Sequence, residues 1–351
     1  MANDTTLSNP SRSTIPSLIA ICFLLSGATA LVYEVLWARM LGLVLGATTV
    51  AISAVLVAFM GGLALGSAAA ARLISRVSRP VRTYALIEMA IGLYALLVPI
   101  LFVGADRAHA VVWQTLHPGL LTSALLRFVM AALVLLIPTS LMGATLPILV
   151  AAVRRVQDHR AAGAAKLYTL NLAGAIVGTV IAGFFVLPSF GVRVTIWIAS
   201  AINLLIGVAA FVFDRKQSSL PRATLNAPDA TESSKTEQSS KRDEVGLLRR
   251  RRFWFLCAFA SGLITIGMQI VWSRVLAMII GSSTYAFTIV LALFLIGLAV
   301  GAWIVSAMIQ TDLASLRRTV LIVQLLTAAM LFFSLRLTSA VPSLLIQTGF
   351  R

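Results

Sequence analysis

The residues best suited to chemistry are a few polar side chains within long apolar segments, and Glu34 is the first of them. It lies near the end of the apolar segment 16–36. A charge at the centre of a bilayer costs on the order of 2.5–3.5 kcal/mol, so such a residue is a candidate functional site. One hypothesis is a buried carboxylate paired with Arg39 or with Arg274. The alternative is a carboxylate at the membrane interface, beside the interfacial Trp37.

A second carboxylate, Glu88, lies about a turn and a half inside the apolar segment 83–104. Three alternatives stand for it. It could pair with Arg82 or Arg127, it could extend its carboxylate to the membrane surface, or it could bind a substrate or a proton.

Two amides, Asn171 and Asn203, lie in the apolar segments 167–188 and 193–213. Amides within membrane helices more often hydrogen-bond to a neighbouring helix than bind a ligand. We therefore expect both residues to join helices, and ligand binding is the alternative.

An internal repeat relates several of these residues. Residues 26–66 read SGATALVYEVLWARMLGLVLGATTVAISAVLVAFMGGLALG, and residues 261–301 read SGLITIGMQIVWSRVLAMIIGSSTYAFTIVLALFLIGLAVG. Fifteen of the 41 aligned positions are identical, including Trp37/Trp272, Arg39/Arg274, Thr49/Thr284 and several glycines. Shared apolar character alone would not align these residues, so the chain contains two copies of one membrane unit. Gln269 replaces Glu34 in the second copy, which predicts a polar contact between the halves in which one side is ionised.

Glycine spacing predicts where helices pack closely, and one proline predicts a bend. Small-x-x-x-small pairs let helix backbones approach each other, and they occur at Gly62/Gly66, Gly174/Gly178 and Gly297/Gly301. Pro147 removes a helix hydrogen bond, and Thr145 can cover a carbonyl that is freed. We expect the segment 124–150 to bend there, either as a hinge or as a feature of shape.

The composition of the chain indicates a membrane protein. The chain is 59% hydrophobic and 11% charged, with a mean hydropathy of +0.97, which excludes a soluble globular domain. Apolar runs of 18 residues or more can cross the bilayer as helices. The sequence predicts an all-α polytopic bundle of about nine transmembrane helices, at 16–36, 47–71, 83–104, 124–150, 167–188, 193–213, 253–276, 284–309 and 318–336.

The charge distribution predicts the orientation. If the N-terminus is cytoplasmic, the N-terminal tail and the loops after even-numbered spans hold 21 of the 28 Lys and Arg residues. This is the positive-inside pattern. The net charge of +16 therefore serves topology and contact with anionic lipids rather than nucleic acid. We expect a multi-pass protein of the cell inner membrane, with the lipid bilayer as its main partner.

The spans divide the chain into five parts. Six spans precede a polar segment, so the two copies of the repeat have the same orientation, as in the two halves of major facilitator transporters. The second copy then contains three spans and is incomplete. The expected parts are a cytoplasmic tail 1–15, a six-helix repeat 16–213, a flexible basic cytoplasmic linker 214–252, a partial second repeat 253–336 and a tail 337–351.

Metal, cofactor and catalytic motifs are not evident. Cys22 and Cys257 read as small buried apolar residues, and His109, His117 and His159 are expected in loops far from them. No two glycines are spaced i, i+2, so the chain has no G-x-G nucleotide turn. We expect no metal site and no cofactor in this chain.

The chain resembles the membrane region of bacterial spermidine synthase-like proteins. The resembling segments are Ser26–Thr49, AFMGGLALGS (Ala58–Ser67), MGATLPIL (Met142–Leu149), LYTLNLAGAIVGTVIAGFFVLP (Leu167–Pro188) and Trp272–Gly301. In that family a facilitator-like membrane region is fused to a cytosolic aminopropyltransferase-type domain. This chain departs from the family's repeated motif at Gln269, where Glu is usual.

The resemblance implies a membrane domain that lacks the catalytic domain and anchors or delivers a polyamine-related small molecule. Its partner would be a separate soluble aminopropyltransferase-type domain or a second copy of the chain. Two alternatives remain, namely a free-standing major-facilitator-like transporter and a truncated membrane-bound aminopropyltransferase.

Overall fold

A computed structural model describes residues 17–45, 48–154, 160–218, 241–281, 283–308, 318, 321–334 and 336. These residues are almost entirely helical and include no strand. Seven of their helical segments are long and apolar enough to cross a membrane. This confirms the all-α, polytopic membrane class, because in hydrocarbon a helix satisfies its own backbone hydrogen bonds.

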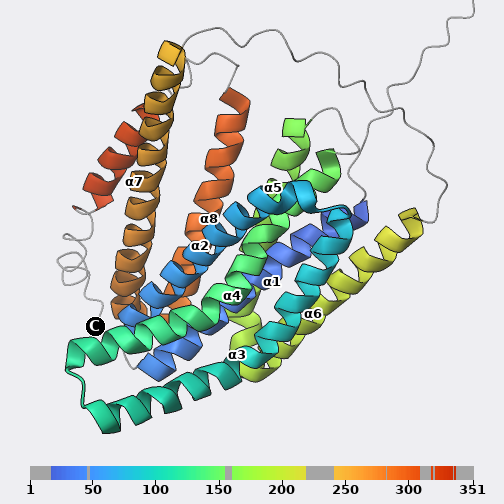
Figure 1. Ribbon diagram of the computed structural model, residues 1–351. Coiled ribbons are helices and arrows are strands. Elements are labelled where there is room, and N and C mark those ends of the chain that lie inside the picture. The colour runs from blue at the N-terminus through green and yellow to red at the C-terminus, as the bar shows by residue number, and fades with distance from the viewer. Residues whose placement is uncertain are drawn as a thin grey trace, which may run out of the picture. The chain divides into compact units, whose positions relative to one another are not determined.

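Eight long helices make up most of the described residues (Figure 1). A 3-10 turn, Ile74–Arg76, follows α2, and a π-helical turn, η2, joins α5 to α6 at Ala182–Val186. The helices are α1 Ser17–Leu45, α2 Thr48–Leu73, α3 Pro80–Leu116, α4 Leu120–Arg154, α5 Arg160–Ile181, α6 Leu187–Ser218, α7 Lys241–Ile280 and α8 Ser283–Met308.

The seven segments and the nine predicted spans differ at two places. The predicted spans 167–188 and 193–213 fall in one helical segment, Ala164–Lys216. That segment is kinked at Gly191, where φ is 74° and ψ is 176°, a conformation open essentially to glycine alone. The kink lies between the two predicted spans. The ninth predicted span contains a shorter apolar helix, Leu321–Ser334.

Several helices extend beyond their predicted ends. α1 continues to Leu45 and α3 to Leu116. The predicted ends follow the fall in hydropathy at charged residues such as Arg39 and Asp106, whereas helical hydrogen bonding continues through these positions. Pro80 suits the first turn of α3, because the amide hydrogen that it lacks would have no partner there.

The predicted linker 214–252 is helical at both of its ends. α6 ends at Ser218 and α7 begins at Lys241. Residues 219–240 of the linker and the predicted tails 1–15 and 337–351 lie outside the described residues. The flexibility of the linker and the cytoplasmic location of the linker and of the tail 1–15 stay predictions.

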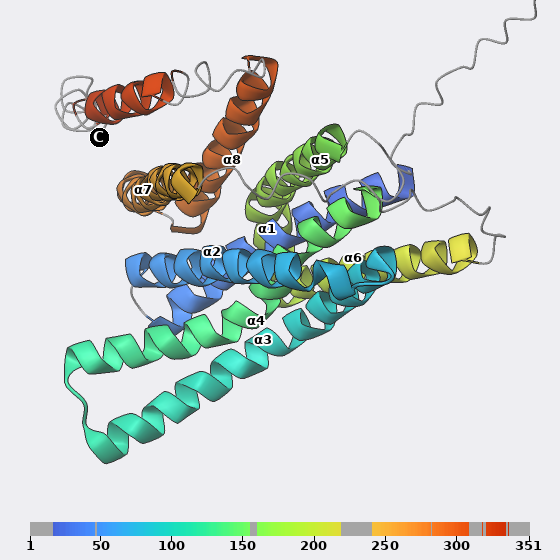
Figure 2. The ribbon, with the colours of Figure 1, turned by 45° about the horizontal axis from the view of Figure 1, so that its top comes forward.

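The chain divides into two compact units, residues 1–296 and 297–351. In the first unit, α2 packs mainly on α4, α1 on α5, and α3 on α6. Figures 1 and 2 show α3 and α4 as a long helical hairpin. In the second unit, the side chains of the helix Leu321–Ser334 are mostly exposed, as lipid-facing residues are.

Close approach of these helix pairs depends on the glycines of the first repeat. A Cβ added at Gly62 would overlap Thr139 of α4, and one added at Gly66 would overlap the backbone of Ser140. Likewise, a Cβ at Gly174 or Gly178 of α5 would overlap the backbone of α1. Added Cβ atoms at Gly297 and Gly301, in the second unit, meet no described atom within 4 Å, and the close packing of this pair stays a prediction.

Pro138 in α4 removes a helical hydrogen bond that another helix replaces. Its missing amide hydrogen frees the carbonyl of Val134, four residues earlier. The hydroxyl of Tyr94 on α3 donates a hydrogen bond to this carbonyl at 3.0 Å. Repair from a neighbouring helix is the usual way in which membrane helices tolerate proline.

The expectation for Thr145 and Pro147 is met in part. The Thr145 hydroxyl donates to the carbonyl of Met142 at 2.7 Å. Pro147 frees the carbonyl of Gly143, so Thr145 bonds to the carbonyl one residue before the freed one. α4 continues through Pro147 to Arg154, and the bend stays a prediction.

Replacing Gly62 with alanine should destabilise the α2–α4 pair, because its Cβ has no room beside Thr139. We expect a loss of about 1–3 kcal/mol in the free energy of unfolding, measured as a lower melting temperature in detergent. The matched control is Gly61→Ala, because an added Cβ at Gly61 meets no atom within 4 Å. Equal melting temperatures for the two variants would show that the glycine contact is not tight.

Candidate functional site

Glu88 is the centre of a hydrogen-bonded cluster inside the first repeat. It lies in α3 and is fully buried. Its Oε1 accepts a hydrogen bond from the hydroxyl of Ser26 in α1 at 2.5 Å, and its Oε2 accepts one from Nδ2 of Asn203 in α6 at 2.6 Å. The carboxylate therefore ties three helices together.

The cluster continues toward the middle of α1. The hydroxyl of Tyr33 lies 3.3 Å from both Oδ1 of Asn203 and Oγ of Ser200, so it can donate to either. Tyr33, Ser200 and Asn203 are all buried. Every polar side chain in this series of contacts has a hydrogen-bond partner. The cluster can therefore hold the helices together without leaving a buried polar group unpaired.

The cation partners expected for Glu88 make other contacts. The guanidinium of Arg82 lies 5.2 Å from the ring centre of Phe211. Arg127 contacts Asp106 and His109. The predicted ion pairs of Glu88 are therefore absent from the structure, and neutral donors on α1 and α6 take their place.

Glu34 differs from Glu88 because no described residue satisfies it. Its side chain is 0% exposed, and neither carboxylate oxygen has a hydrogen-bond partner among the described residues. The predicted pairing with Arg39 or Arg274 is therefore not found. α1 continues past Glu34 to Leu45, and the position of Glu34 relative to the membrane interface stays a prediction.

Aromatic rings and further unpaired polar atoms accompany Glu34. Trp37, one helical turn further along α1, is fully buried, and its Nε1 also has no partner among the described residues. The rings of Tyr33 and Trp37 stack with their centres 5.4 Å apart. In α7, Nε2 of Gln269 and Oγ of Ser273 are buried and equally unpaired within the described structure.

The two repeat-related arginines have different surroundings. Arg39 donates from Nη1 to the hydroxyl of Thr284 in α8 at 2.9 Å. Arg274, its equivalent in α7, has no such bond to a described residue, although both side chains are exposed. The contact of Arg39 joins the first copy of the repeat to the second. A cavity of about 150 Å³ adjoins it, with Arg39 and Thr284 in its lining.

The two amides join helices, which is the first of the alternatives weighed from the sequence. Asn171 of α5 donates from Nδ2 to the carbonyl of Phe23 in α1 at 3.2 Å. Asn203 joins α6 to both Glu88 and Tyr33. All three bonds cross between helices, as those of amides in membrane helices often do.

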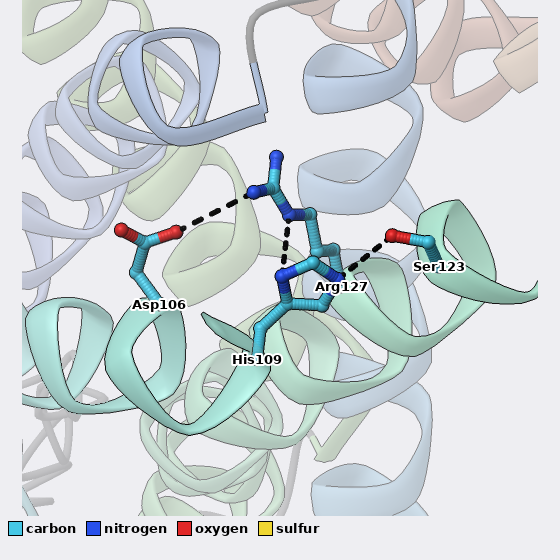
Figure 3. A network of polar contacts seen from close by, with 4 residues as sticks. All are labelled: Asp106, His109, Ser123 and Arg127. Carbon is cyan, nitrogen blue, oxygen red and sulfur yellow. Dashed lines mark hydrogen bonds and ion pairs between the residues drawn. The ribbon is translucent and has the colours of Figure 1, made fainter. Parts of the chain in front are cut away.

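A second polar cluster lies near the ends of α3 and α4 that face each other across their connecting turn (Figure 3). His109 lies in α3 and is 3% exposed, which corrects its expected place in a loop. Arg127 of α4 donates from Nε to Nδ1 of His109 at 3.1 Å, and Arg127 and Asp106 approach to 3.9 Å. Oγ of Ser123 lies 2.8 Å from Nε2 of His109.

The geometry of this cluster defines what His109 can do. Since Nδ1 accepts a hydrogen bond, the proton of a neutral imidazole is on Nε2, which then donates to Ser123. A histidine in that state cannot take the proton of the serine hydroxyl as a general base. We therefore interpret the cluster as a clamp between two helices. The described residues also contain no group of three His, Cys, Asp or Glu side chains placed to hold a metal ion.

Sequence reasoning missed most members of both clusters. Ser26 recurs at Ser261 within the repeat, which could have marked it. Tyr33 and Ser200 carry no comparable signal, because single hydroxyls are common in membrane helices. His109 and Ser123 meet because α3 and α4 continue past the ends of the predicted spans. The hydropathy of the sequence underestimates the lengths of these two helices.

Taken together, these features describe a multi-pass helical membrane protein in which buried polar side chains lie between closely packed helices. The family model of the Major Facilitator Superfamily matches residues 18–350. The chain therefore belongs to this superfamily.

One relative with a named activity matches part of the chain at low identity. Polyamine aminopropyltransferase 1 of Streptomyces coelicolor is 27% identical over 214 residues, which are 60% of this chain and 37% of the relative. The chain thus spans little more than a third of that protein's length. No solved structure matches the chain.

Removing Asn203 should cost more stability than removing Asn171. Asn203→Leu takes a donor from Glu88 and an acceptor from Tyr33, whereas Asn171→Leu removes one bond to a backbone carbonyl. Each buried polar group left without a partner costs about 1–3 kcal/mol. We expect a lower melting temperature for Asn203→Leu in detergent, and equal values for the two variants would contradict the central role of the cluster.

Replacing His109 with phenylalanine should loosen the facing ends of α3 and α4. The change leaves Arg127 and Ser123 without their partner in the clamp. We expect faster hydrogen–deuterium exchange across residues 105–127, measured by mass spectrometry. His117→Asn serves as the control, because His117 lies at the end of α3 with a φ of 41° that asparagine tolerates. Unchanged exchange in His109→Phe would rule out the clamp.

Proposed function

We propose that this chain is the membrane domain of a spermidine synthase-like protein and that it binds a polyamine-related organic cation. The bound cation would be anchored near, or delivered to, a soluble aminopropyltransferase-type domain. The partial similarity to a polyamine aminopropyltransferase supports the substrate class. Membership of the Major Facilitator Superfamily supports the handling of a small solute.

The carboxylate of Glu34 is the observation that carries this proposal. Burying an ionised carboxylate without a partner is costly, so a buried unpaired carboxylate favours a cation that reaches it. An ammonium group supplies both the opposite charge and hydrogen-bond donors, and such charge-assisted bonds are among the strongest in proteins. The stacked rings of Tyr33 and Trp37 add aromatic faces that attract ammonium groups.

Glu88 serves a different purpose in this proposal. Both of its carboxylate oxygens already accept hydrogen bonds from protein donors. It holds α1, α3 and α6 in place, and so supports the segment of α1 that contains Glu34. The two carboxylates thus divide into a binding group and a positioning group.

The proposal includes a place and an orientation. The positive-inside pattern supports the cell inner membrane, with the N-terminus and the 214–252 segment in the cytoplasm. A soluble aminopropyltransferase-type domain on that side could receive the cation. A second copy of the chain is the alternative partner. We expect no binding of nucleic acid.

A free-standing transporter is the second candidate function. It is supported by the extent of the family match, which runs from residue 18 to residue 350. A transporter would move a polyamine across a membrane without any soluble enzyme. Uptake of labelled spermidine into liposomes that contain only this chain would favour the transporter. Binding without uptake would favour the membrane-domain proposal.

Binding of spermidine to the purified chain in lipid nanodiscs tests the role of Glu34. Glu34→Gln keeps the shape and removes the charge, as Gln269 does naturally in the second copy. We expect the affinity for spermidine to fall by at least about tenfold, the effect of losing roughly 1.4 kcal/mol. Scintillation proximity with labelled spermidine would measure it.

Two controls make the result specific. Gln269→Glu adds a carboxylate at the equivalent position, and we expect it to retain binding. The melting temperature of Glu34→Gln should match that of the native chain, which separates lost binding from lost folding. Equal affinities for the native chain and Glu34→Gln, or no binding by either, would refute the proposed site.

A further inference from the structure

We propose that Arg39 and Thr284 form a latch that closes one end of the interface between the two copies of the repeat. Here "latch" means the hydrogen bond from Nη1 of Arg39 to Oγ1 of Thr284, 2.9 Å long. Arg39 lies in α1 of the first copy, and Thr284 lies at the start of α8 in the second. The bond therefore has to break if the copies separate at this end.

Two further contacts of α8 lie beside the latch residue Thr284. The ring of Tyr285 stacks on that of Phe184 in η2, with centres 5.7 Å apart and planes 16° apart. A Cβ added at Gly183, also in η2, would overlap Thr288 of α8. The first turns of α8 thus dock against the π-helical turn as well as against α1. Single π-helical turns often occur at functional positions in helices.

The cavity of about 150 Å³ lies against the latch. Its polar lining comes from Arg39 and Thr284, and its remaining lining is Val35, Ala38, Gly42, Leu43, Ile52 and Phe287. Val35 follows Glu34 directly in α1. The cavity thus adjoins the turn of α1 that follows the unpaired carboxylate.

Among the described side chains of α7, the fully buried ones lie in the second half of the helix. Gln269 and Ser273, in the last part of α7, are 4% and 0% exposed. Earlier in the helix, Phe255 and Phe259 are each 68% exposed. The last residues of α7, 278–280, are exposed, so the buried positions lie about two turns or more before the helix ends beside Thr284.

The repeat provides an internal comparison. Arg274 occupies the position of Arg39 in the second copy, within the same Trp-x-Arg pattern. Both arginines are exposed, but none of the contacts among the described residues involves the side chain of Arg274. Equivalent arginines therefore differ in one respect that matters here, the bond to α8, and Arg274 is a natural control.

The latch regulates access to the site proposed around Glu34, and in this respect it rests on the proposed function. The existence of the latch does not depend on the proposed function, because the opening of the interface can be measured without any ligand. The predicted topology places the end of α1 and the start of α8 on the outer side of the membrane. The latch would then close the outer side.

Labelling of a buried cysteine tests the latch. In a chain with Cys22→Ala and Cys257→Ala, the substitution Ser273→Cys places a thiol at a fully buried position of α7. The protein in liposomes is treated with a membrane-impermeant maleimide, and the rate of labelling is measured. Arg39→Ala and Thr284→Val each remove the latch, and Thr284→Val keeps the size of the side chain.

We expect both latch variants to increase the labelling rate by about tenfold, the shift in a two-state equilibrium that follows the loss of one charge-assisted hydrogen bond. Arg274→Ala should leave the rate unchanged, although it is adjacent to the reporter. Equal rates in the latch variants and the parent overturn the proposal. So does an equal increase in Arg274→Ala.

Folding and function are separated in this design. Melting temperatures show whether a latch variant has unfolded, and Thr284→Val remains informative if Arg39→Ala does not fold. No spermidine is present during labelling. Failure of the latch thus leaves the spermidine-binding result at Glu34 untouched, and failure of spermidine binding leaves the labelling result interpretable.

Discussion

The hydrogen bonds of Glu88 are the interaction on which the first repeat depends. Hydrocarbon offers no partner to a polar group, so each such group has to be satisfied by the protein itself. Ser26 and Asn203 provide that satisfaction from two other helices. The glycine contacts of α2 and α5 complement it, because dispersion forces become effective only where helix backbones approach closely. Polar bonds thus define which helices meet, and small residues define how closely.

The two copies of the repeat have diverged where chemistry is concerned. The first copy contains Glu34 and the second contains Gln269, yet both side chains are buried and carry unpaired polar atoms within the described structure. Arg39 and Arg274 are both exposed, but Arg39 bonds to α8 whereas the side chain of Arg274 contacts no other described residue. The same Trp-x-Arg pattern therefore makes different contacts in the two copies. The carboxylate at this position of the repeat is present in the first copy alone. Under the proposed function, an asymmetric arrangement of this kind would give a cation one preferred position rather than two equivalent ones.

Hydropathy and glycine spacing predict the membrane class, the approximate spans and the close contacts of Gly62 and Gly66. These features are predictable because they depend on the local composition of the sequence and on the four-residue spacing of the glycines. The partners of Glu88 could not be predicted, since Asn203 is 115 residues away and several cations stood nearer in sequence. The length of α3 and the burial of His109 were also beyond prediction, because charged residues lower hydropathy without ending a helix. Local pattern thus identifies candidate residues, whereas their pairing depends on tertiary packing.

The position of Glu34 relative to the latch has a mechanical consequence. Glu34 and Arg39 lie little more than a turn apart on one continuous helix, α1. A helix of this kind moves nearly as a unit, so a shift of α1 at the carboxylate also moves the guanidinium. A cation could therefore bias the latch, but only if it binds the closed and open arrangements with different affinities. Such coupling is reciprocal, so a chain without the latch should also differ from the native chain in its affinity for the cation. The relation between site and latch is thus a thermodynamic one and does not require direct contact between them.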